Sequence, residues 1–204
     1  MSWKDFIAKR KGEIIFTVII LAVVLFFLPK FLAFIEQRNG VVLPDPILKL
    51  FNPVDLTWLI FALIYLSLIS AIIYFSTKPE MLFTALQSYA VLIISRMIVM
   101  YVTPFNAPAD SIILNDPFVQ LFGSGKILTK DLFFSGHTAT VFLFFLIADK
   151  KYLKFIYLFF TVLVGIAVLM QHVHYTVDVI AAPFFAYTSF SLVRVLRNKI
   201  NKTA

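Results

Sequence analysis

Long apolar segments separated by short polar connections dominate this chain. A helix that crosses a membrane needs about 20 mostly apolar residues, with a range of roughly 17–25. Six stretches meet this requirement: residues 14–35, 56–75, 81–102, 132–148, 152–171 and 173–194. The pattern predicts an all-α polytopic membrane protein built as a bundle of six transmembrane helices. Pro29-Lys30 should interrupt the first helix, and the short fourth stretch should leave its first turn near the membrane surface.

The connections divide the chain into one membrane domain with two short ends. Residues 1–13 form a basic, partly amphipathic N-terminal segment, residues 14–195 the six-helix catalytic membrane domain, and residues 196–204 a short tail. The outer connections, 36–55 and 103–131, are longer than the inner ones. Long loops in compact proteins are often functional. The second connection is therefore either a lid or lipid-contacting segment around residues 118–122, or a plain interfacial loop.

Composition and charge support the membrane interpretation. Hydrophobic residues make up 61% of the chain and charged residues 14%, whereas soluble domains have about 45–50% and about 25%. Cysteine is absent, which excludes disulfides and thiolate metal sites. The net charge of +7 is explained by membrane topology and anionic lipid, and no motif indicates nucleic acid.

Lysine and arginine are unevenly distributed between the two sides of the predicted bundle. Twelve lie at the ends and inner connections, and five lie in the outer connections or at the outer end of the first helix. Cytoplasmic loops carry the excess of these residues. We therefore expect a multi-pass protein of the plasma, inner or an internal membrane, with both termini in the cytoplasm.

His174 and Asp178 form the first candidate pair for chemistry. They are four residues apart, which on a helix places them on one face. The carboxylate could fix one imidazole nitrogen and leave the other as a nucleophile. The alternative is a structural pair that ties two helices together.

His137 begins the fourth apolar stretch, directly after Ser135-Gly136. Serine is a favoured helix N-cap, glycine permits close approach to the backbone, and the start of a helix attracts anions. A histidine there could protonate a departing oxygen. The alternative is a turn that carries an incidental histidine.

The topology predicts that these groups share one side of the membrane. The fourth and sixth helices both begin at the outer side of the membrane and run inward. His137, His174 and Asp178 should therefore all lie at the outer end of the bundle, in the extracytoplasmic or lumenal leaflet. Arg96 lies seven residues before Thr103, in the same leaflet, where its guanidinium could hold a phosphate. Otherwise Arg96 extends to the lipid headgroups.

A metal site is not expected. His172 and His174 are two residues apart and would not face each other on a helix, and no HExxH motif is present. His172 is more typical of a supporting or loop residue than of a catalytic one.

The stretches Asp131-Leu-Phe-Phe-Ser-Gly-His-Thr138 and His172-Val-His-Tyr-Thr-Val-Asp178 resemble motifs of the phosphatidic acid phosphatase type 2 superfamily, and within it the sphingomyelin synthase branch. Leu43-Pro44-Asp45 with Phe51, and Arg96 with Met100-Tyr-Val-Thr103, are similar to two weaker motifs of that branch. The likeness extends over roughly residues 40–190.

The resemblance implies an all-α six-helix enzyme that transfers a phospho-headgroup between lipids. His174 would attack phosphorus, Asp178 would orient it, and His137 would act as acid and then base. The resemblance also implies that no metal or other cofactor is needed. The partners would be a phospholipid donor and a lipid or water acceptor. The substrate would be bound by residues of the same motifs: Arg96, Tyr101, Asp131, Ser135, Gly136 and His172.

Departures from the superfamily pattern affect the choice of substrate. The Lys-x6-Arg-Pro motif typical of the hydrolytic members is absent. Those members also carry Ser-Arg six residues before the nucleophilic histidine, whereas this chain has Val at position 168. A phosphate monoester carries nearly two charges, and a diester only one, so the single intramembrane Arg96 favours diesters. A lipid phosphate phosphatase and a phospholipase C-like enzyme stay open as alternatives. A small channel or transporter would show inverted repeats, which the sequence lacks.

Overall fold

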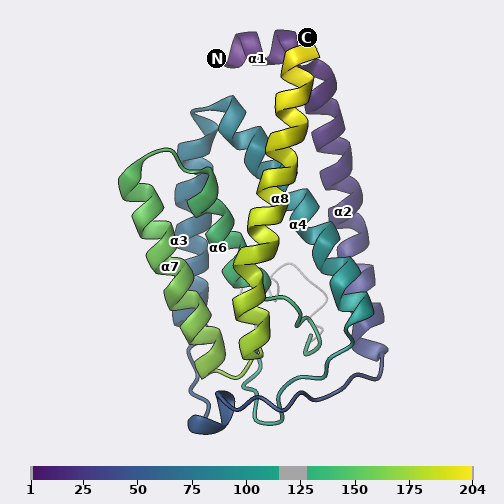
Figure 1. The fold of residues 1–204 in the computed structure, drawn as a ribbon, viewed down its shortest axis with the longest axis vertical. Coiled ribbons are helices and arrows are strands. Elements are labelled where there is room, and N and C mark those ends of the chain that lie inside the picture. The colour runs from purple at the N-terminus through teal and green to yellow at the C-terminus, as the bar shows by residue number, and fades with distance from the viewer. Residues whose placement is uncertain (1, 115–127, 204) are drawn as a thin grey trace.

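The computed structural model describes residues 2–114 and 128–203 of the chain as an all-α fold (Figure 1). Its elements are α1 (Trp3–Lys9), α2 (Lys11–Gln37), the short 3₁₀ helix η1 (Leu48–Leu50), α3 (Thr57–Ser76), α4 (Pro79–Val102), α6 (Gly136–Ile147), α7 (Lys151–Met170) and α8 (Thr176–Thr203). The part of residues 103–131 that was expected to form a lid, around residues 118–122, lies outside the described residues.

Five of these helices are long and apolar enough to cross a membrane: α2, α3, α4, α7 and α8. The protein is therefore a polytopic helical membrane protein, but the expectation of six full spans is corrected. The predicted fourth span, 132–148, contains only the 12-residue helix α6. At 1.5 Å per residue α6 is about 18 Å long, well short of the roughly 30 Å hydrocarbon core.

The other helix ends also differ from the predicted ones. α2 continues through Pro29 as one helix of 27 residues, so Pro29-Lys30 does not interrupt it. α8 begins at Thr176 and continues to Thr203. It therefore starts three residues later than predicted and includes most of the predicted tail. The basic N-terminal segment contains the separate helix α1.

Successive long helices run in alternate directions, and both termini lie at the same end of the bundle (Figure 1). We call this the terminal end; it also carries the α3–α4 and α6–α7 connections. The opposite end, the loop end, carries residues 38–56, residues 103–114 and 128–135, and the α7–α8 turn. Its segments are joined by backbone hydrogen bonds from Val54 N–H to the Met170 carbonyl, 2.8 Å, and from Ile112 N–H to the Gln171 carbonyl, 3.1 Å.

α6 lies inside the bundle and packs against α4, α7 and α8. One side of α6 contributes Leu143 to a hydrophobic cluster that also contains Tyr157. Another side contributes Val141 to a second hydrophobic cluster, which contains Val164. Gly165 allows close approach, because a Cβ there would lie 3.0 Å from Val179 Cγ1. This packing holds the first turn of α6 beside the first turn of α8.

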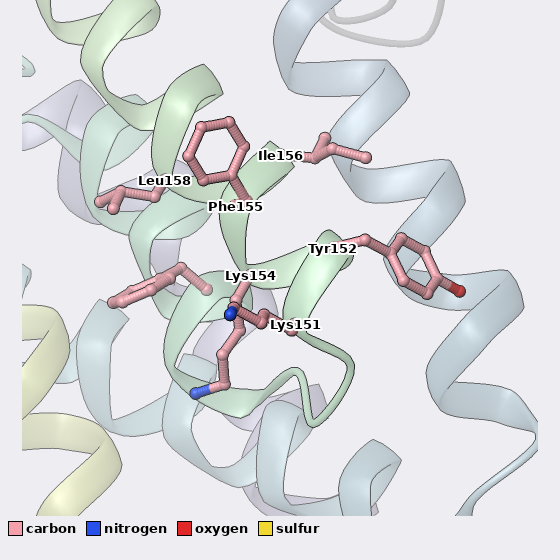
Figure 2. A pocket seen from close by; sticks show the side chains of 7 residues that line it. Lys151, Tyr152, Lys154, Phe155, Ile156 and Leu158 are labelled. Carbon is pink, nitrogen blue, oxygen red and sulfur yellow. The ribbon is translucent and has the colours of Figure 1, made fainter.

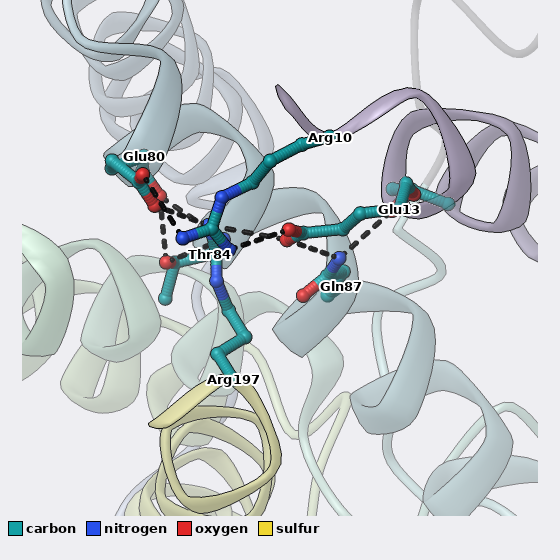
Figure 3. Close-up of polar contacts among 7 residues, drawn as sticks. Arg10, Glu13, Glu80, Thr84, Gln87 and Arg197 are labelled. Carbon is teal, nitrogen blue, oxygen red and sulfur yellow. Dashed lines mark hydrogen bonds and ion pairs between the residues drawn. The ribbon is translucent and has the colours of Figure 1, made fainter. Parts of the chain in front are cut away.

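The terminal end contains a partly buried group of charges, Arg10, Glu13, Glu80 and Arg197, which we call the terminal-end cluster (Figure 3). The Arg197 guanidinium contacts Glu80 at 2.5 Å and Glu13 at 3.1 Å. Arg10 contacts the same two carboxylates, at 2.9 Å from Glu13 and 3.7 Å from Glu80. Two arginines and two glutamates balance in charge and join α2, α4 and α8.

Candidate active site at the loop end

The turn between α7 and α8 is set by the end of α7. His172 N–H donates to the Leu169 carbonyl at 2.9 Å, and Val173 N–H donates to the Val168 carbonyl at 3.1 Å. These two bonds form a Schellman motif, whose capping residue has a left-handed backbone and is usually glycine. Here that residue is His172, with φ of 56°. The turn reverses the chain and brings His174 to the start of α8.

His174 and Asp178 are in contact and almost completely buried. His174 Nδ1 lies 3.2 Å from Asp178 Oδ2, and the two residues are 2% and 0% exposed. The sequence analysis placed both on one helix, but α8 begins only at Thr176. The contact forms because Asp178 is the third residue of α8 and reaches back past the start of the helix. It uses Nδ1, so Nε2 is the nitrogen that can face a substrate.

Asp178 also caps its own helix. Its Oδ2 accepts a hydrogen bond from the Tyr175 N–H at 3.0 Å, as the acidic residue of a capping box does. A structural role is therefore present alongside any catalytic one. Its second oxygen, Oδ1, is buried and makes no hydrogen bond within the described residues. Because a buried acceptor without a partner is costly, helix capping alone does not account for this carboxylate.

Ser135 fixes the start of α6, as its sequence position predicted. Its hydroxyl accepts a hydrogen bond from the Thr138 N–H at 3.4 Å, which confirms the N-cap. Its own N–H donates to the Asp178 carbonyl at 3.1 Å. This second bond joins the first turn of α6 directly to the first turn of α8. The two helix starts therefore keep a fixed relation to each other.

His137, the second residue of α6, faces His174 as a result. The centroids of the two imidazole rings are 6.2 Å apart and the rings are inclined by 65°. A phosphate group fits between two rings at this separation. Its phosphorus would lie about 3–3.5 Å from a nitrogen of one ring, and one of its oxygens about 2.6–3.2 Å from a nitrogen of the other. The Phe61 ring lies 6.2 Å from the His137 ring on another side.

Arg96, on α4, holds the segment that precedes α6. Its Nε donates to the Phe134 carbonyl at 2.9 Å, and its Nη2 donates to the Asp131 carbonyl at 3.1 Å. Nη2 also lies 2.8 Å from Asp131 Oδ1, although this ion pair is not aligned as a hydrogen bond. Arg96 is thus directed into the protein and organises the turn that carries Ser135-Gly136-His137.

Gly136 lies directly against the Arg96 guanidinium. A Cβ atom at position 136 would be 2.9 Å from Arg96 Cζ and 3.1 Å from its Nη1. Such distances require the guanidinium to move, so glycine is what allows the cation to reach the start of α6. The structure therefore brings together Arg96, Asp131, Ser135, Gly136 and His137, and His174 with Asp178 beside them.

Two other predicted substrate-binding residues have different surroundings. Tyr101 is 56% exposed, and its ring contacts the Phe34 ring and the Arg38 guanidinium, with centroid distances of 6.4 Å and 4.7 Å. The His172 ring packs against Phe51 at 5.3 Å, and its buried Nε2 makes no hydrogen bond within the described residues. Neither is in a described contact with His137 or His174.

Gln171 is a residue that the sequence reasoning missed. Its side-chain amide donates to Thr57 Oγ1 at 2.9 Å and to the Ile112 carbonyl at 3.2 Å, and it accepts from the Leu56 N–H at 3.0 Å. One buried amide thus joins three segments at the loop end. A single glutamine after an apolar run gives no pattern from which this role could be predicted.

Asp45 stabilises the start of α8 from a distant loop. Its carboxylate accepts from the Thr176 N–H at 2.6 Å and from the Thr176 hydroxyl at 3.1 Å. Burial raises the pKa of Asp45, but the hydrogen bonds from Thr176, Ile47 and Leu48 outweigh it and hold the pKa below its usual value. The sequence analysis noted Asp45 in a weak motif, but not its partner 131 residues later.

The described residues include no group of three or more His, Cys, Asp or Glu side chains arranged to hold a metal ion. The chemistry available at the site is instead that of two imidazoles, one of them oriented by a carboxylate, next to an arginine and the N-terminus of a helix. A buried histidine of this kind can act as a nucleophile, and its neighbour can transfer a proton.

Comparison with known proteins gives a family match over about one third of the chain. No curated protein matches the sequence. Residues 130–195 match the family model described as PAP2 superfamily C-terminal. The matched range includes Asp131, Ser135, His137, His174 and Asp178, and it leaves Arg96 outside. The match supports the PAP2-like superfamily, whose members are phosphatases or phosphotransferases, and thereby supports a membrane enzyme of lipid phosphate chemistry.

Proposed function

We propose that the protein is a lipid phosphotransferase of the sphingomyelin-synthase type, which transfers a phospho-headgroup from one lipid to another through a phosphohistidine. The observation that carries the proposal is the arrangement of His137, His174 and Asp178. One imidazole is oriented by a buried carboxylate at 3.2 Å, and the second ring lies 6.2 Å away.

In the first step, His174 Nε2 attacks the phosphorus of a phospholipid. A nitrogen–phosphorus bond forms and the bond from phosphorus to the lipid alcohol oxygen breaks. His137, protonated at the start, gives its proton to that oxygen, and the lipid alcohol leaves. Asp178 accepts the hydrogen bond from Nδ1 and stabilises the charge that develops on the His174 ring.

In the second step, the hydroxyl of an acceptor lipid gives its proton to His137 and attacks the same phosphorus. The new oxygen–phosphorus bond forms as the nitrogen–phosphorus bond breaks, and both histidines return to their starting states. Water as the acceptor would turn the same sequence into a phospholipase C-like hydrolysis. A phosphomonoester donor would make the enzyme a lipid phosphate phosphatase.

The charge near the helix starts favours a diester as the donor. The Arg96 guanidinium adjoins Gly136, and the Asp131 carboxylate lies 2.8 Å from it. Part of the arginine charge is therefore already balanced before any phosphate enters. A dianionic monoester needs more positive charge than this for its burial, whereas a singly charged diester needs less.

The excess of lysine and arginine at the terminal end supports a cytoplasmic position for that end. On this assignment both termini are cytoplasmic, and His137 and His174 act on lipids of the extracytoplasmic or lumenal leaflet. Labelling of single introduced cysteines at positions 2 and 110 with an impermeant reagent tests it, because only position 110 should react in intact cells.

The activity is tested with purified protein and phosphorus-labelled lipids. We expect labelled phosphatidylcholine or phosphatidylethanolamine to pass its headgroup to ceramide or diacylglycerol, with acid-labile label on the protein as the intermediate. Release of inorganic phosphate from phosphatidic acid, with no transfer from either diester, would replace the transferase by the phosphatase. Release of a free phospho-headgroup alone would replace it by the phospholipase C-like enzyme.

A further inference from the structure

A second place on the molecule has the chemistry of a ligand site and lies outside the histidine site. It is a surface groove of about 730 Å³ at the start of α7, lined by Phe145, Lys151, Tyr152, Lys154, Phe155, Ile156 and Leu158 (Figure 2). The α6–α7 connection beside it belongs to the terminal end of the bundle (Figure 1). The groove therefore lies at the opposite end from the α7–α8 turn.

The floor of the groove is apolar and unusually exposed. Phe155 is 75% exposed and Tyr152 is 61% exposed, and both lie on a helix that is apolar enough to cross a membrane. In a bilayer such side chains contact acyl chains. Phe155 and Leu158 lie along the helix beyond the two lysines (Figure 2), so an acyl chain on them would follow the helix into the membrane.

The edge of the groove is positively charged. Lys150, Lys151 and Lys154 fall within five residues, and none of them forms an ion pair within the described residues. Lys154 Nζ lies over the Phe145 ring, 5.4 Å from its centroid, which keeps its charge at the groove.

The neighbouring acidic residue does not neutralise these lysines. Asp149 is paired with Lys78 at 2.5 Å and also accepts a hydrogen bond from the Tyr74 hydroxyl. These contacts lower the pKa of Asp149 to about 2. The first turn of α7 itself contains no acidic residue.

We propose that this groove binds an anionic phospholipid of the leaflet at the terminal end, with its phosphate on Lys151 and Lys154 and one acyl chain along Phe145, Phe155 and Leu158. Basic pockets on transmembrane proteins at the cytoplasmic face bind anionic headgroups in this way. Two lysines beside an exposed aromatic floor favour a lipid over a soluble phosphate. The floor contributes to the binding free energy only when an acyl chain covers it.

Native mass spectrometry of the detergent-solubilised protein tests the site, with phosphatidylglycerol and phosphatidylcholine of the same acyl chains as probes. We expect phosphatidylglycerol to be retained preferentially. The double variant K151Q/K154Q should bind it roughly ten- to thirtyfold more weakly, the loss expected for two lysines near an anionic lipid. The matched control K9Q/K11Q removes two charges from the same end of the bundle and should bind as the parent does.

Equal binding by K151Q/K154Q and the parent would overturn the proposal. An equal loss in K9Q/K11Q would also overturn it, because the attraction would then be due to net charge and not to the groove. A third variant, Phe155→Ser, should weaken the retention of phosphatidylglycerol while leaving both lysines in place. Displacement of the bound lipid by glycerol phosphate would show that the floor contributes nothing and would reject a lipid site.

Discussion

The two groups of charges at opposite ends of the bundle differ in the hydrogen bonds that their buried polar atoms make. In the terminal-end cluster Arg197 contacts Glu13, Glu80 and Thr84, and Gln87 joins Glu13 to Thr17 at 3.1 Å and 2.8 Å. At the loop end, Asp178 Oδ1 and His172 Nε2 are buried without a hydrogen bond in the part of the chain that the structure describes. Asp131 Oδ1 lies 2.8 Å from Arg96 Nη2 in an ion pair that is not aligned as a hydrogen bond.

This difference separates a structural role from a functional one. A cluster that is balanced in charge, and whose arginine is bonded on both sides, stabilises the packing of its helices. A buried acceptor without a hydrogen bond, such as Asp178 Oδ1, costs free energy in the unliganded state, and a substrate or a water that bonds to it recovers part of that cost. Both ends bury an ionisable side chain, Arg197 at one and Asp178 at the other, and the hydrogen bonds of these two side chains distinguish the ends.

The largest effect is expected from His174→Ala, which tests the functional half of the comparison. The variant should lose turnover and covalent labelling by at least about a thousandfold, as removal of a nucleophile does, because no other group replaces Nε2. Transfer of labelled headgroup and phosphoprotein formation measure this. The helical circular dichroism and thermal midpoint serve as controls and should change little. Full activity in the variant would show that His174 is not the nucleophile.

Arg197→Met tests the structural role of the terminal-end cluster. Removing one partner of a buried ion pair leaves uncompensated charge and costs roughly 3–5 kcal/mol. That charge is here chiefly on Glu13, because the Glu80 side chain is 38% exposed and solvated. We expect a large fall in the free energy of unfolding, with unchanged turnover per folded molecule. The exposed Arg194 on the same helix provides the control Arg194→Met, which should stay within about 0.5 kcal/mol of the parent. A stable Arg197→Met protein would contradict the structural role.

Arg96→Lys asks whether the loop-end arginine acts through its shape. Lysine keeps the charge but cannot bond Phe134 and Asp131 together through two nitrogens. We expect about a hundredfold loss of kcat, as misplacement of a catalytic group by about 1 Å can cause. Arg194→Lys should have no effect. An unchanged rate in Arg96→Lys would mean that only the positive charge of residue 96 is needed.

Asp131→Asn tests the charge balance that favours diesters. Freeing Arg96 from the carboxylate at 2.8 Å should raise the ratio of monoester to diester turnover by roughly tenfold, since one unit charge at this range is worth more than that at intermediate dielectric. Kinetics with phosphatidic acid and phosphatidylcholine measure the ratio. The exposed Asp110 at the loop end gives the control Asp110→Asn. If Asp131→Asn and Asp110→Asn have the same ratio of monoester to diester turnover, the Asp131 carboxylate does not determine the preference for diesters.

The smallest effect concerns Asp45, whose folded-state pKa lies below its unfolded value of about 3.9. A depressed pKa means that the stabilisation is fully present above about pH 4 and is lost as the pH falls through the folded-state pKa. Asp45→Asn should therefore lower stability by about 1 kcal/mol at neutral pH, as loss of a helix cap does. Thermal midpoints of the two proteins should converge under acid conditions, and a constant difference would contradict the assignment.

The apolar pattern predicted the helical membrane fold well because each long helix is encoded locally. The same reasoning failed for residues 132–148. The apolar run there includes Leu132, Phe133 and Phe134, which look helical in sequence but precede the Ser135 cap. Their backbone is held by Arg96, which is 38 residues from Phe134 in the sequence. Hydrophobic periodicity carries no information about such a contact.

The candidate site was predictable to the extent that its residues lie next to helix starts. Ser135 and Asp178 occupy capping positions, which short-range rules describe. The partners that complete the loop end were not predictable, since Asp45 meets Thr176 across 131 residues and Gln171 meets Thr57 across 114. Those contacts are decided by the packing of whole helices and not by local spacing.

The shortness of α6 has a consequence for the peptide groups that stand in place of its missing turns. Irregular backbone at membrane depth cannot obtain hydrogen bonds from lipid and is tolerated only where protein or enclosed water supplies them. Arg96 supplies them to the carbonyls of Asp131 and Phe134, and α8 accepts the one from the Ser135 N–H. The Arg96 guanidinium thus takes the place of water for these main-chain carbonyls, and its loss would leave both of them in need of another donor.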